Sequence, residues 1–416
     1  MQRPAFYAYD ASSQLTQVAQ APLTPVTLQY DAANRRTALT LPNGVLTTYE
    51  YDPASRLTRL AYSGPPGSLG ELTYQYDAAG NRTGVGGTFA RTLVPDPVPS
   101  ATYDAANQQL FFDPKSMTYD NNGNLLSLTE PAGTTVFGWD ARNHLVSLGG
   151  AISGTFAYDA QGRRIRRDIA GEVREYQYDE VDIVREQVNG ADATYLRTLG
   201  IDEAVCRIAP EGTAYYLADA LSSTVALTDG GGSLGTTYTY EPFGRTASAG
   251  TVSANPFQFT GRENDGTGLY YYRFRYYNTL LARFSGEDPI HKRGCPEPFL
   301  RLELRWERPD AFLATGNALE LYTYADNNPV TLSDPLGLEA GPPTCNGVWR
   351  RVGWDRSFNV ICLCYWLCVS PQGSAWSGNP RSLPATFGIL THTGRGGLRR
   401  GDDCFCSRKP GPEVPR

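Results

Sequence analysis

The sequence predicts a mainly β protein, and three observations lead to this prediction. Tyrosine is abundant, with 26 residues among 416, and side chains of this type favour pleated, half-buried strands. Glycine and proline are also frequent, with 43 and 29 residues, and both favour the turns between strands. Finally, an aromatic residue followed by aspartate recurs with a period near twenty residues. Together they predict a long series of short antiparallel strands joined by tight turns.

The repeated unit has the pattern of a β-hairpin. Each aromatic-Asp pair leads into a turn-rich segment and then a basic or apolar one, as in "YDAAGNRTGV" and "YDAQGRRIRR". The aromatic residue is expected to end one strand, the aspartate to begin the turn, and glycine or asparagine to supply a positive φ. Tyr-Asp is also a common strand-to-turn dipeptide, but nine copies at intervals of 16 to 27 residues argue against chance. One hairpin cannot bury its own face, so neighbouring hairpins are expected to stack into a continuous sheet, with the tyrosines as architecture. The pairs are Tyr9-Asp10, Tyr30-Asp31, Tyr51-Asp52, Tyr76-Asp77, Tyr103-Asp104, Tyr119-Asp120, Trp139-Asp140, Tyr158-Asp159 and Tyr178-Asp179.

The last 78 residues differ in composition from the rest of the chain. Residues 1–338 contain 27 Lys and Arg residues, 38 Asp and Glu residues, and two cysteines. Residues 339–416 contain 10 Lys and Arg residues, 5 Asp and Glu residues, and six cysteines. The tail is thus a small basic module attached to an acidic body, and basic modules often bind anionic partners such as nucleic acid. The longest apolar run, Phe358–Val369, is too short for a membrane span of about 20 residues, and no signal peptide follows Met1.

Three segments carry a family resemblance. The Tyr-Asp array up to about residue 190 resembles the RHS/YD-repeat family. Tyr215–Arg245, Asn255–Pro289 and "LELYTYADNNPVTLSDPLGL" resemble the RHS-repeat-associated core of that family. The chain is also similar to toxin-complex C subunits and, more remotely, to teneurin YD shells. The resemblance implies a spiral of β-hairpins that forms part of a hollow shell, a core domain that plugs it, and a variable C-terminal toxin. The expected domains are 1–190 (repeat shell), 191–338 (core domain ending in DPLGL) and 339–416 (cysteine-rich toxin domain).

Two Asp-Pro dipeptides flank the end of the predicted core, at Asp288 and Asp334. Asp-Pro is mainly a turn former, but two carboxyl groups close together can share a proton and cut a peptide bond, as in aspartic-protease dyads. The resemblance implies that these are autoproteolytic aspartates and that the cut falls between Leu338 and Glu339. Arg283, five residues before Asp288, is the candidate for a positive charge near the two aspartates. The family pattern has a glycine after Asp-Pro-Ile and a second aspartate about twenty residues on. Here His291 follows Ile290 and the two aspartates are 46 residues apart, a length that loop closure tolerates.

The tail contains six cysteines among 78 residues, an even number that favours a disulfide framework in an exported module. Sequence cannot choose among the 15 possible pairings. Zinc is the competing interpretation, because two Cys-x-Cys pairs offer four thiolates, although zinc sites more often use a two-residue spacer. No cofactor is expected for the shell or the core. His392, as a general base, and Asp402 and Asp403 beside Arg399 and Arg400 are the candidate toxin residues. The cysteines are Cys345, Cys362, Cys364, Cys368, Cys404 and Cys406.

Two functional hypotheses of different classes follow. In the first, the chain is the C-terminal part of an RHS-type polymorphic toxin, secreted or at the cell surface, whose core self-cleaves after Leu338 and releases a small basic effector. Its expected partners are an upstream shell or delivery machinery, a cognate immunity protein, and a tail target such as nucleic acid. In the second, the chain is a cell-surface adhesion protein whose tyrosines bind carbohydrate and whose tail is a disulfide-bonded cap. A truncated relic is a third alternative.

Overall fold

The computed structural model describes residues 4–289, 321–338, 345–354 and 360–368. The chain divides into two compact units, residues 1–342 and residues 343–416. The first unit contains two large antiparallel sheets, which we call the wall, and one small sheet. This architecture confirms the predicted mainly β fold. Among the residues described, no helix has the length and hydrophobicity that crossing a membrane requires.

The first wall sheet has eight strands, and their order in the sheet is their order in the sequence. Each strand pairs antiparallel with the next, so the sheet is a simple meander of hairpins. Its strands are β1 (Phe6–Tyr9), β2 (Leu15–Ala19), β3 (Val26–Tyr30), β4 (Arg36–Thr40), β5 (Leu46–Tyr51), β6 (Leu57–Gly64), β7 (Gly67–Tyr76) and β8 (Arg82–Gly86).

The second wall sheet continues the same meander over sixteen strands. β18 and β19 form one hairpin across residue 190, so the sheet passes through the predicted domain boundary and ends at Gly250. Its strands are β9 (Ala101–Tyr103), β10 (Gln109–Phe112), β11 (Lys115–Tyr119), β12 (Leu125–Glu130), β13 (Gly133–Trp139), β14 (Leu145–Gly150), β15 (Gly154–Tyr158), β16 (Arg164–Ile169), β17 (Glu172–Asp179), β18 (Asp182–Val188), β19 (Ala191–Arg197), β20 (Ala204–Ala209), β21 (Gly212–Ala218), β22 (Thr224–Thr228), β23 (Leu234–Tyr240) and β24 (Thr246–Gly250).

Eight of the nine aromatic-Asp pairs make the turns that the sequence predicts. At Tyr178-Asp179, β17 instead runs through Asp179, and the positive φ lies at Glu180. At Tyr51, one of the eight, β5 ends, and Asp52 accepts a hydrogen bond from the backbone N–H of Arg56. The residue three positions after the aspartate has a positive φ, as at Ser55 and Gly80. The tyrosine hydroxyl donates to a carbonyl oxygen about fifteen residues earlier, which joins each hairpin to the previous one. The repeat is therefore architectural.

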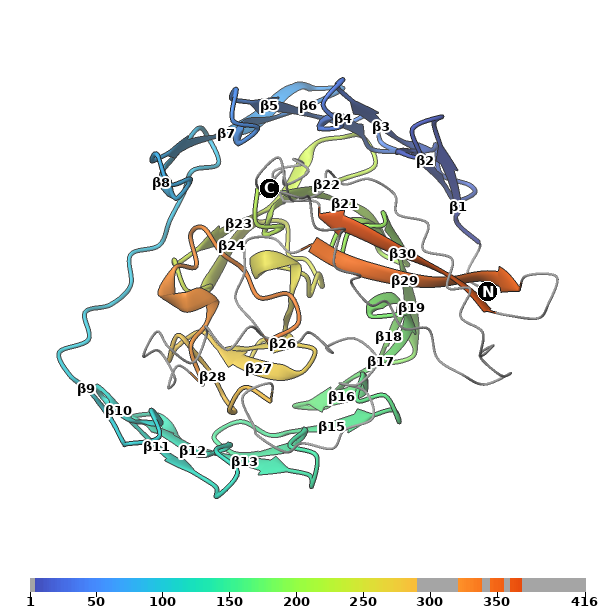
Figure 1. The fold of residues 1–416 in the computed structure, drawn as a ribbon. Helices are drawn as coiled ribbons and strands as arrows, with labels where there is room; N and C mark the ends of the chain where they lie inside the picture. Colours follow the sequence, from blue (N-terminus) through green and yellow to red (C-terminus); the bar gives the residue numbers. More distant parts are fainter. Residues whose placement is uncertain (1–3, 290–320, 339–344, 355–359, 369–416) are drawn as a thin grey trace, which may run out of the picture. The chain divides into compact units, whose positions relative to one another are not determined.

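The two wall sheets pack against each other over one shared hydrophobic core. Leu57, Leu60 and Leu72 of the first sheet belong to the same buried cluster as Leu196 and Val205 of the second. Polar contacts cross the same interface, including the Tyr62 hydroxyl with the Ala218 carbonyl oxygen and the Asn43 side chain with Thr228. In Figure 1, β3–β6 accordingly lie beside β21 and β22, so late strands of the chain pack against early ones.

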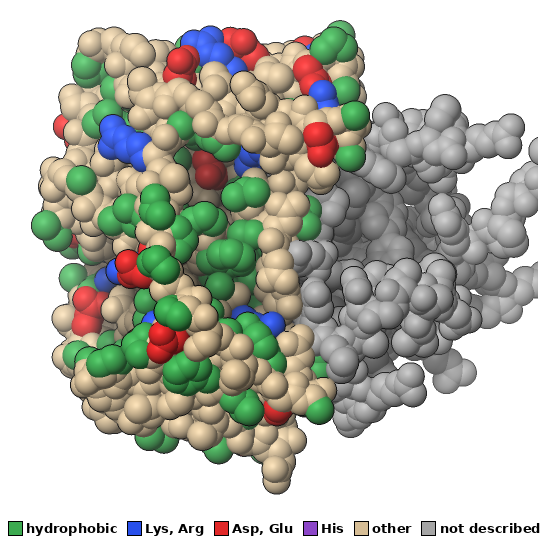
Figure 2. All heavy atoms as spheres, turned by 90° about the vertical axis from the view of Figure 1, so that its left-hand side faces the viewer, with side chains coloured by type: hydrophobic (Ala, Val, Ile, Leu, Met, Phe, Trp, Pro, Cys, Tyr) green, Lys and Arg blue, Asp and Glu red, His purple; other side chains and the backbone are tan. Residues whose placement is uncertain are grey.

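The two sheets are joined by an extended connection, residues 87–100, between β8 and β9. This segment is tied to the second sheet at several places: the Leu93 N–H donates to the Tyr240 carbonyl oxygen, Asp96 forms an ion pair with Arg245, and the Asp113 N–H donates to the Ser100 carbonyl oxygen. Val94 and Val98 within it are exposed. Figure 2 faces this side and shows hydrophobic side chains gathered in the middle of the face, with charged side chains spread around them.

The wall strands surround the small sheet, whose strands we call the core strands (Figure 1). This sheet is almost completely buried, and it contributes three tyrosines and one phenylalanine to a single cluster. Residues 321–338 run beside it, and the Phe284 N–H donates to the Tyr322 carbonyl oxygen. The core strands are β25 (Glu263–Asn264), β26 (Leu269–Tyr272), β27 (Arg275–Asn278) and β28 (Arg283–Phe284), and two short 3-10 turns are η1 (Phe259–Gly261) and η3 (Ala325–Asn327).

The second unit contains, in its described residues, one antiparallel hairpin formed by β29 (Cys345–Trp354) and β30 (Val360–Cys368). The backbone register places Cys345 opposite Cys368. Cys362 and Cys364 also lie in β30. The predicted boundary at residues 338 and 339 stays a prediction, as does the assignment of 191–338 as one core domain.

Candidate active site

The Asp-Pro-Leu-Gly-Leu segment folds into a tight turn around its own aspartate. The Asp334 Oδ1 atom accepts hydrogen bonds from the N–H groups of Gly337 at 2.8 Å and Leu338 at 3.0 Å. Gly337 has a φ of 72°, and a Cβ atom there would lie 2.6 Å from the carbonyl oxygen of Tyr272. Glycine is therefore required at this position, both for its backbone conformation and for the space available. The turn fixes the backbone of Leu338 beside the Asp334 carboxylate.

Asp288 is brought to the same place by the strand that precedes it. It follows β28 by four residues, and its N–H donates to the Leu321 carbonyl oxygen at 2.9 Å. Residues 321–338 thus run alongside the end of β28, and this pairing joins two segments that are distant in the sequence. The side chains of Asp288 and Asp334 are both buried, at 7% and 2% exposure.

A single buried arginine joins the two carboxylates. The Arg275 Nη2 atom lies 3.2 Å from Asp288 Oδ2 and 3.3 Å from Asp334 Oδ2. The rest of the guanidinium is fixed by the carbonyl oxygens of Leu321 and Gly337, and it stacks on Phe284 with its central carbon 3.7 Å from the ring centroid. Burial lowers the pKa of Arg275, while the two carboxylates act in the opposite direction. The geometry therefore gathers three ionisable groups in the buried interior of the protein.

Arg275 places one positive charge between two buried carboxylates. Two ionised carboxylates on one cation repel each other, and burial adds to the cost of ionising both. A proton on one carboxyl group relieves this repulsion. The arrangement favours a pair in which one group is an acid and the other a base, and their protons belong to the pair.

The predicted cleavage site, the bond between Leu338 and Glu339, starts next to this cluster. Leu338 is buried, and its nitrogen lies 3.0 Å from Asp334 Oδ1. Standard backbone geometry places its carbonyl carbon about 2.5 Å from that nitrogen. Glu339, on the other side of the bond, lies outside the described residues. The carbonyl group of Leu338 is therefore within a few ångström of a buried carboxylate.

Arg283, the cation expected near the aspartates, lies elsewhere. Its guanidinium donates to the carbonyl oxygen and side-chain oxygen of Asn107 at 2.9 and 3.2 Å and stacks on Tyr103. This corrects the expectation, because the cation that contacts both carboxylates is Arg275. Sequence reasoning missed Arg275 because it considered only the residues close to Asp288. A signal was present: an arginine within the aromatic run "YYYRFRYY" needs a buried partner of opposite charge.

The candidate residues of the tail fall mostly outside the described residues. The cysteines of β29 and β30 are placed only by their backbone register. In the described ranges, no group of three or more His, Cys, Asp or Glu residues is arranged to hold a metal ion. Disulfides and zinc in the tail both stay predictions. The candidates outside the described residues are His392, Arg399, Arg400, Asp402, Asp403, Cys404 and Cys406.

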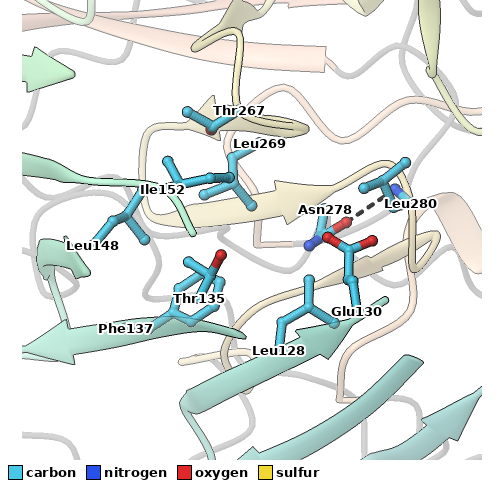
Figure 3. Close-up of a pocket in the computed structure, with 10 residues that line it drawn as sticks. All are labelled: Leu128, Glu130, Thr135, Phe137, Leu148, Ile152, Thr267, Leu269, Asn278 and Leu280. Atoms are coloured by element: carbon cyan, nitrogen blue, oxygen red, sulfur yellow. Dashed lines mark hydrogen bonds between the residues drawn. The ribbon is translucent and has the colours of Figure 1, made fainter. Parts of the chain in front are cut away.

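Two cavities lie between the wall and the core strands. Figure 3 shows a cavity between β12–β14 and the β26–β27 hairpin, lined mainly by leucine, isoleucine and phenylalanine side chains. Its volume is about 10 Å³, enough for about one water molecule. This part of the interface therefore packs the wall onto the core. The second cavity, of about 280 Å³, lies between β16–β17 and the core strand β25, and polar side chains such as Arg167, Arg174 and Asn264 line it.

Comparison with known proteins agrees with this fold. Residues 43–330 match the teneurin YD-shell family, and residues 9–46 match the RHS repeat. The chain is 27% identical over 318 residues to the tRNA nuclease WapA of Bacillus subtilis, in an alignment that covers 69% of this chain and 12% of that protein. It is 30% identical over 139 residues to the toxin subunit YenC1 of Yersinia entomophaga, covering 32% of this chain and 12% of that protein.

A solved structure shows the same fold. The crystal structure of TcdB2-TccC3-Cdc42 superposes with a TM-score of 0.55 at 21% identity, over 80% of this chain and 20% of that one. The chain therefore spans only a small part of the length of the proteins that it resembles. Because the family match extends over more than half of the sequence, the chain belongs to the teneurin YD-shell family.

Proposed function

We propose that this chain is part of an RHS-type polymorphic toxin whose core cleaves its own chain between Leu338 and Glu339. The observation that carries the proposal is the buried cluster in which Arg275 contacts both Asp288 and Asp334. This cluster lies beside the Leu338 backbone. A buried triad of this kind is a weak stabiliser, because desolvation offsets much of the attraction between its charges.

The two aspartates take different roles in the proposed reaction. Asp334 accepts two backbone N–H groups, which favours its ionised form, so it acts as the base. Asp288 carries the proton and acts as the acid. Asp334 removes a proton from a water molecule, and the oxygen of that water attacks the Leu338 carbonyl carbon. The C–N bond then breaks as Asp288 gives its proton to the Glu339 nitrogen, leaving a carboxylate at Leu338 and an amine at Glu339.

The released module would be the effector. Residues 339–416 are basic, and a basic charge suits a nucleic acid as the target. Two kinds of observation support a toxin over an adhesion protein. The similar proteins include a tRNA nuclease and a toxin subunit by name. Repeat tyrosines such as Tyr30, Tyr51 and Tyr158 also bond to the backbone of neighbouring hairpins, which gives them a structural use. Under this proposal the chain is exported, a delivery machinery carries it, and an immunity protein protects the producer.

Self-cleavage is tested by measuring the intact mass of the purified full-length chain. The expected result is a C-terminal fragment that begins at Glu339, which is absent in Asp334→Asn and Asp288→Asn. Asp229→Asn is the matched control, because Asp229 caps a wall turn through two backbone N–H groups and is exposed. That variant should cleave like the wild type. A wild-type chain that folds and stays whole would contradict the proposal.

Effector activity is tested in bacteria that express the full chain. Growth should be inhibited by the wild type, less so by Asp334→Asn, and not by a chain that ends at Leu338. Each chain is directed to the cytoplasm in one strain and to the periplasm in another, because the tail cysteines need an oxidising compartment to form disulfides. Equal growth of the wild type and the chain ending at Leu338 in both compartments would count against a toxic tail.

A further inference from the structure

The turn between β26 and β27 holds the segment before the proposed cleavage site along its backbone. The two residues of the turn and the first residue of β27 each donate a hydrogen bond to one of three consecutive carbonyl oxygens. Side chains supply the first and third of these bonds, and a backbone N–H supplies the second. The pairs are Arg273 with Pro335 at 2.6 Å, Phe274 with Leu336 at 3.2 Å, and Arg275 with Gly337.

Arg273 connects this segment to the wall. Its other four hydrogen bonds run to two places in the wall. One is the start of β18, where it donates to the Val181 carbonyl oxygen and the Asp182 carboxylate, and the other is the turn between β19 and β20, where it donates twice to the Asp202 carboxylate. An arginine has five N–H donors, so every donor of Arg273 is used. Burial acts to lower the pKa of Arg273, but Asp202 and Asp182 outweigh it and hold the pKa above its usual value. The side chain is therefore a charged link between the wall and the Pro335 carbonyl.

The backbone at Arg273 indicates that this side chain is needed at this position. Arg273 is the first residue of a two-residue turn, since Tyr272 pairs directly with Arg275. Its φ is 55°, a left-handed conformation that residues other than glycine adopt at a cost. Two-residue hairpin turns favour glycine or asparagine at such a position. An arginine here suggests that its contacts offset the strain.

We propose that Arg273 is a positioning residue for self-cleavage, one that holds residues 334–338 against these two places in the wall. Because Val181, Asp182 and Asp202 lie in the wall, the Leu338 carbonyl is aligned with the carboxylates only after β17–β20 have folded around the core strands. Cleavage is thereby coupled to assembly of the wall. This inference rests on the proposed self-cleavage. It adds that cleavage requires an assembled wall and that Arg273 is the residue through which the wall acts.

The first test is the rate of cleavage in full-length chains made by cell-free synthesis and sampled after translation is stopped. Arg273→Met should slow cleavage by about 10- to 100-fold, the loss expected from a small misplacement of reacting groups. Arg273→Lys should restore part of the rate, since an ammonium keeps the charge but cannot reach the carbonyl and both carboxylates together. Asp182→Asn should slow cleavage to a smaller extent, because it weakens the link at the wall and leaves residues 334–338 untouched.

Arg36→Met is the matched control. Arg36 also forms a part-buried ion pair, with Glu203, but it contacts no residue of the segment 334–338. Its variant should lower the thermal stability of the chain while leaving the cleavage rate at the wild-type value. A general loss of stability would slow both variants alike, whereas a positioning role slows only Arg273→Met.

The second test does not depend on cleavage. Hydrogen exchange is measured by mass spectrometry in an Asp288→Asn background, where the chain stays whole. The N–H groups of Gly337 and Leu338, which donate to Asp334, should exchange at least about tenfold faster in Arg273→Met, because the turn that protects them opens more often. Unchanged exchange together with an unchanged cleavage rate would overturn the inference. If the wild type never cleaves, the proposed function fails, and the exchange result still decides whether Arg273 positions the segment.

Discussion

The aspartates of the wall turns and Asp334 begin similar turns with different consequences. Asp52 accepts the backbone N–H of Arg56 with one carboxylate oxygen and the side chain of the same residue with the other. Asp334 likewise uses one oxygen for backbone N–H groups, but its other oxygen faces Arg275, which also contacts Asp288. The hydrogen-bond partners of the Asp52 carboxylate lie within five residues of sequence, whereas those of the Asp334 carboxylate include a residue that is distant in the sequence.

This difference shows what converts a structural turn into a candidate active site. The local hydrogen bonds are the same in kind, so an Asp-containing turn by itself indicates no chemistry. Burial and a second carboxylate on a shared cation change the protonation of the group, and both come from the packing of the core strands inside the wall. The comparison can be tested by removing each of these features in turn.

The largest effect is expected from Arg275→Met. The substitution leaves two buried carboxylates without their shared cation, which should cost about 3 to 5 kcal/mol of stability and reduce cleavage by at least about 100-fold. Arg283→Met is the comparison, because Arg283 bonds to Asn107 and contacts neither aspartate. It should cost about 1 kcal/mol and cleave within about twofold of the wild type. Intact mass over time measures the cleavage rate of the two variants, and thermal denaturation measures their stability. Equal loss of cleavage in the two variants would contradict the assignment of Arg275 as the shared cation.

An intermediate effect is expected from Gly337→Ala. The new Cβ would approach the Tyr272 carbonyl oxygen to 2.6 Å at a φ of 72°, so the segment has to shift, at a cost of about 2 to 4 kcal/mol. Gly80→Ala in a wall turn has a similar φ of 90° but open space around it, so it should cost about 1 kcal/mol. Only Gly337→Ala should slow cleavage. Normal cleavage in that variant would show that the tight turn is not needed.

The smallest effect concerns the pH dependence of the wall. Burial acts to raise the pKa of Asp52, but hydrogen bonds from Arg56 outweigh it and hold the pKa below its usual value. A lowered folded-state pKa means that the unfolded chain binds more protons. The stabilisation is therefore complete above about pH 4, the unfolded value, and is lost as the pH falls through the folded value. Between pH 7 and pH 3 the melting temperature should fall less steeply for Asp52→Asn than for its parent chain. Both chains carry Asp288→Asn, so that they stay whole. Parallel curves would contradict this.

The wall could be predicted from the sequence in detail, because its rules are local. A tyrosine that ends a strand, an aspartate that caps the turn and a glycine or asparagine at the left-handed position occur within a few residues of each other. The stacking of hairpins then follows from the period. How the two sheets share one core was not predicted, since residues such as Leu57 and Val205 are far apart in the sequence.

The candidate site was predicted in part. Asp288 and Asp334 were identified from the family resemblance, and the structure places them on one arginine although 46 residues separate them in the sequence. Arg283 was chosen for its closeness in sequence, which is a poor guide inside a sheet, because successive residues of a strand point to opposite faces. The roles of Arg275 and Arg273 depend on contacts with residues about sixty positions away.

The sequence by itself determined the hairpin repeat, its turns and the change of composition after Leu338. These features need only local backbone preferences and the periodic burial of apolar side chains. The tertiary structure alone decided which cation joins the two aspartates and which parts of the wall hold the Asp-Pro-Leu-Gly-Leu segment. A buried charge finds its partner through the packing of distant segments, and that packing is a property of the folded chain as a whole.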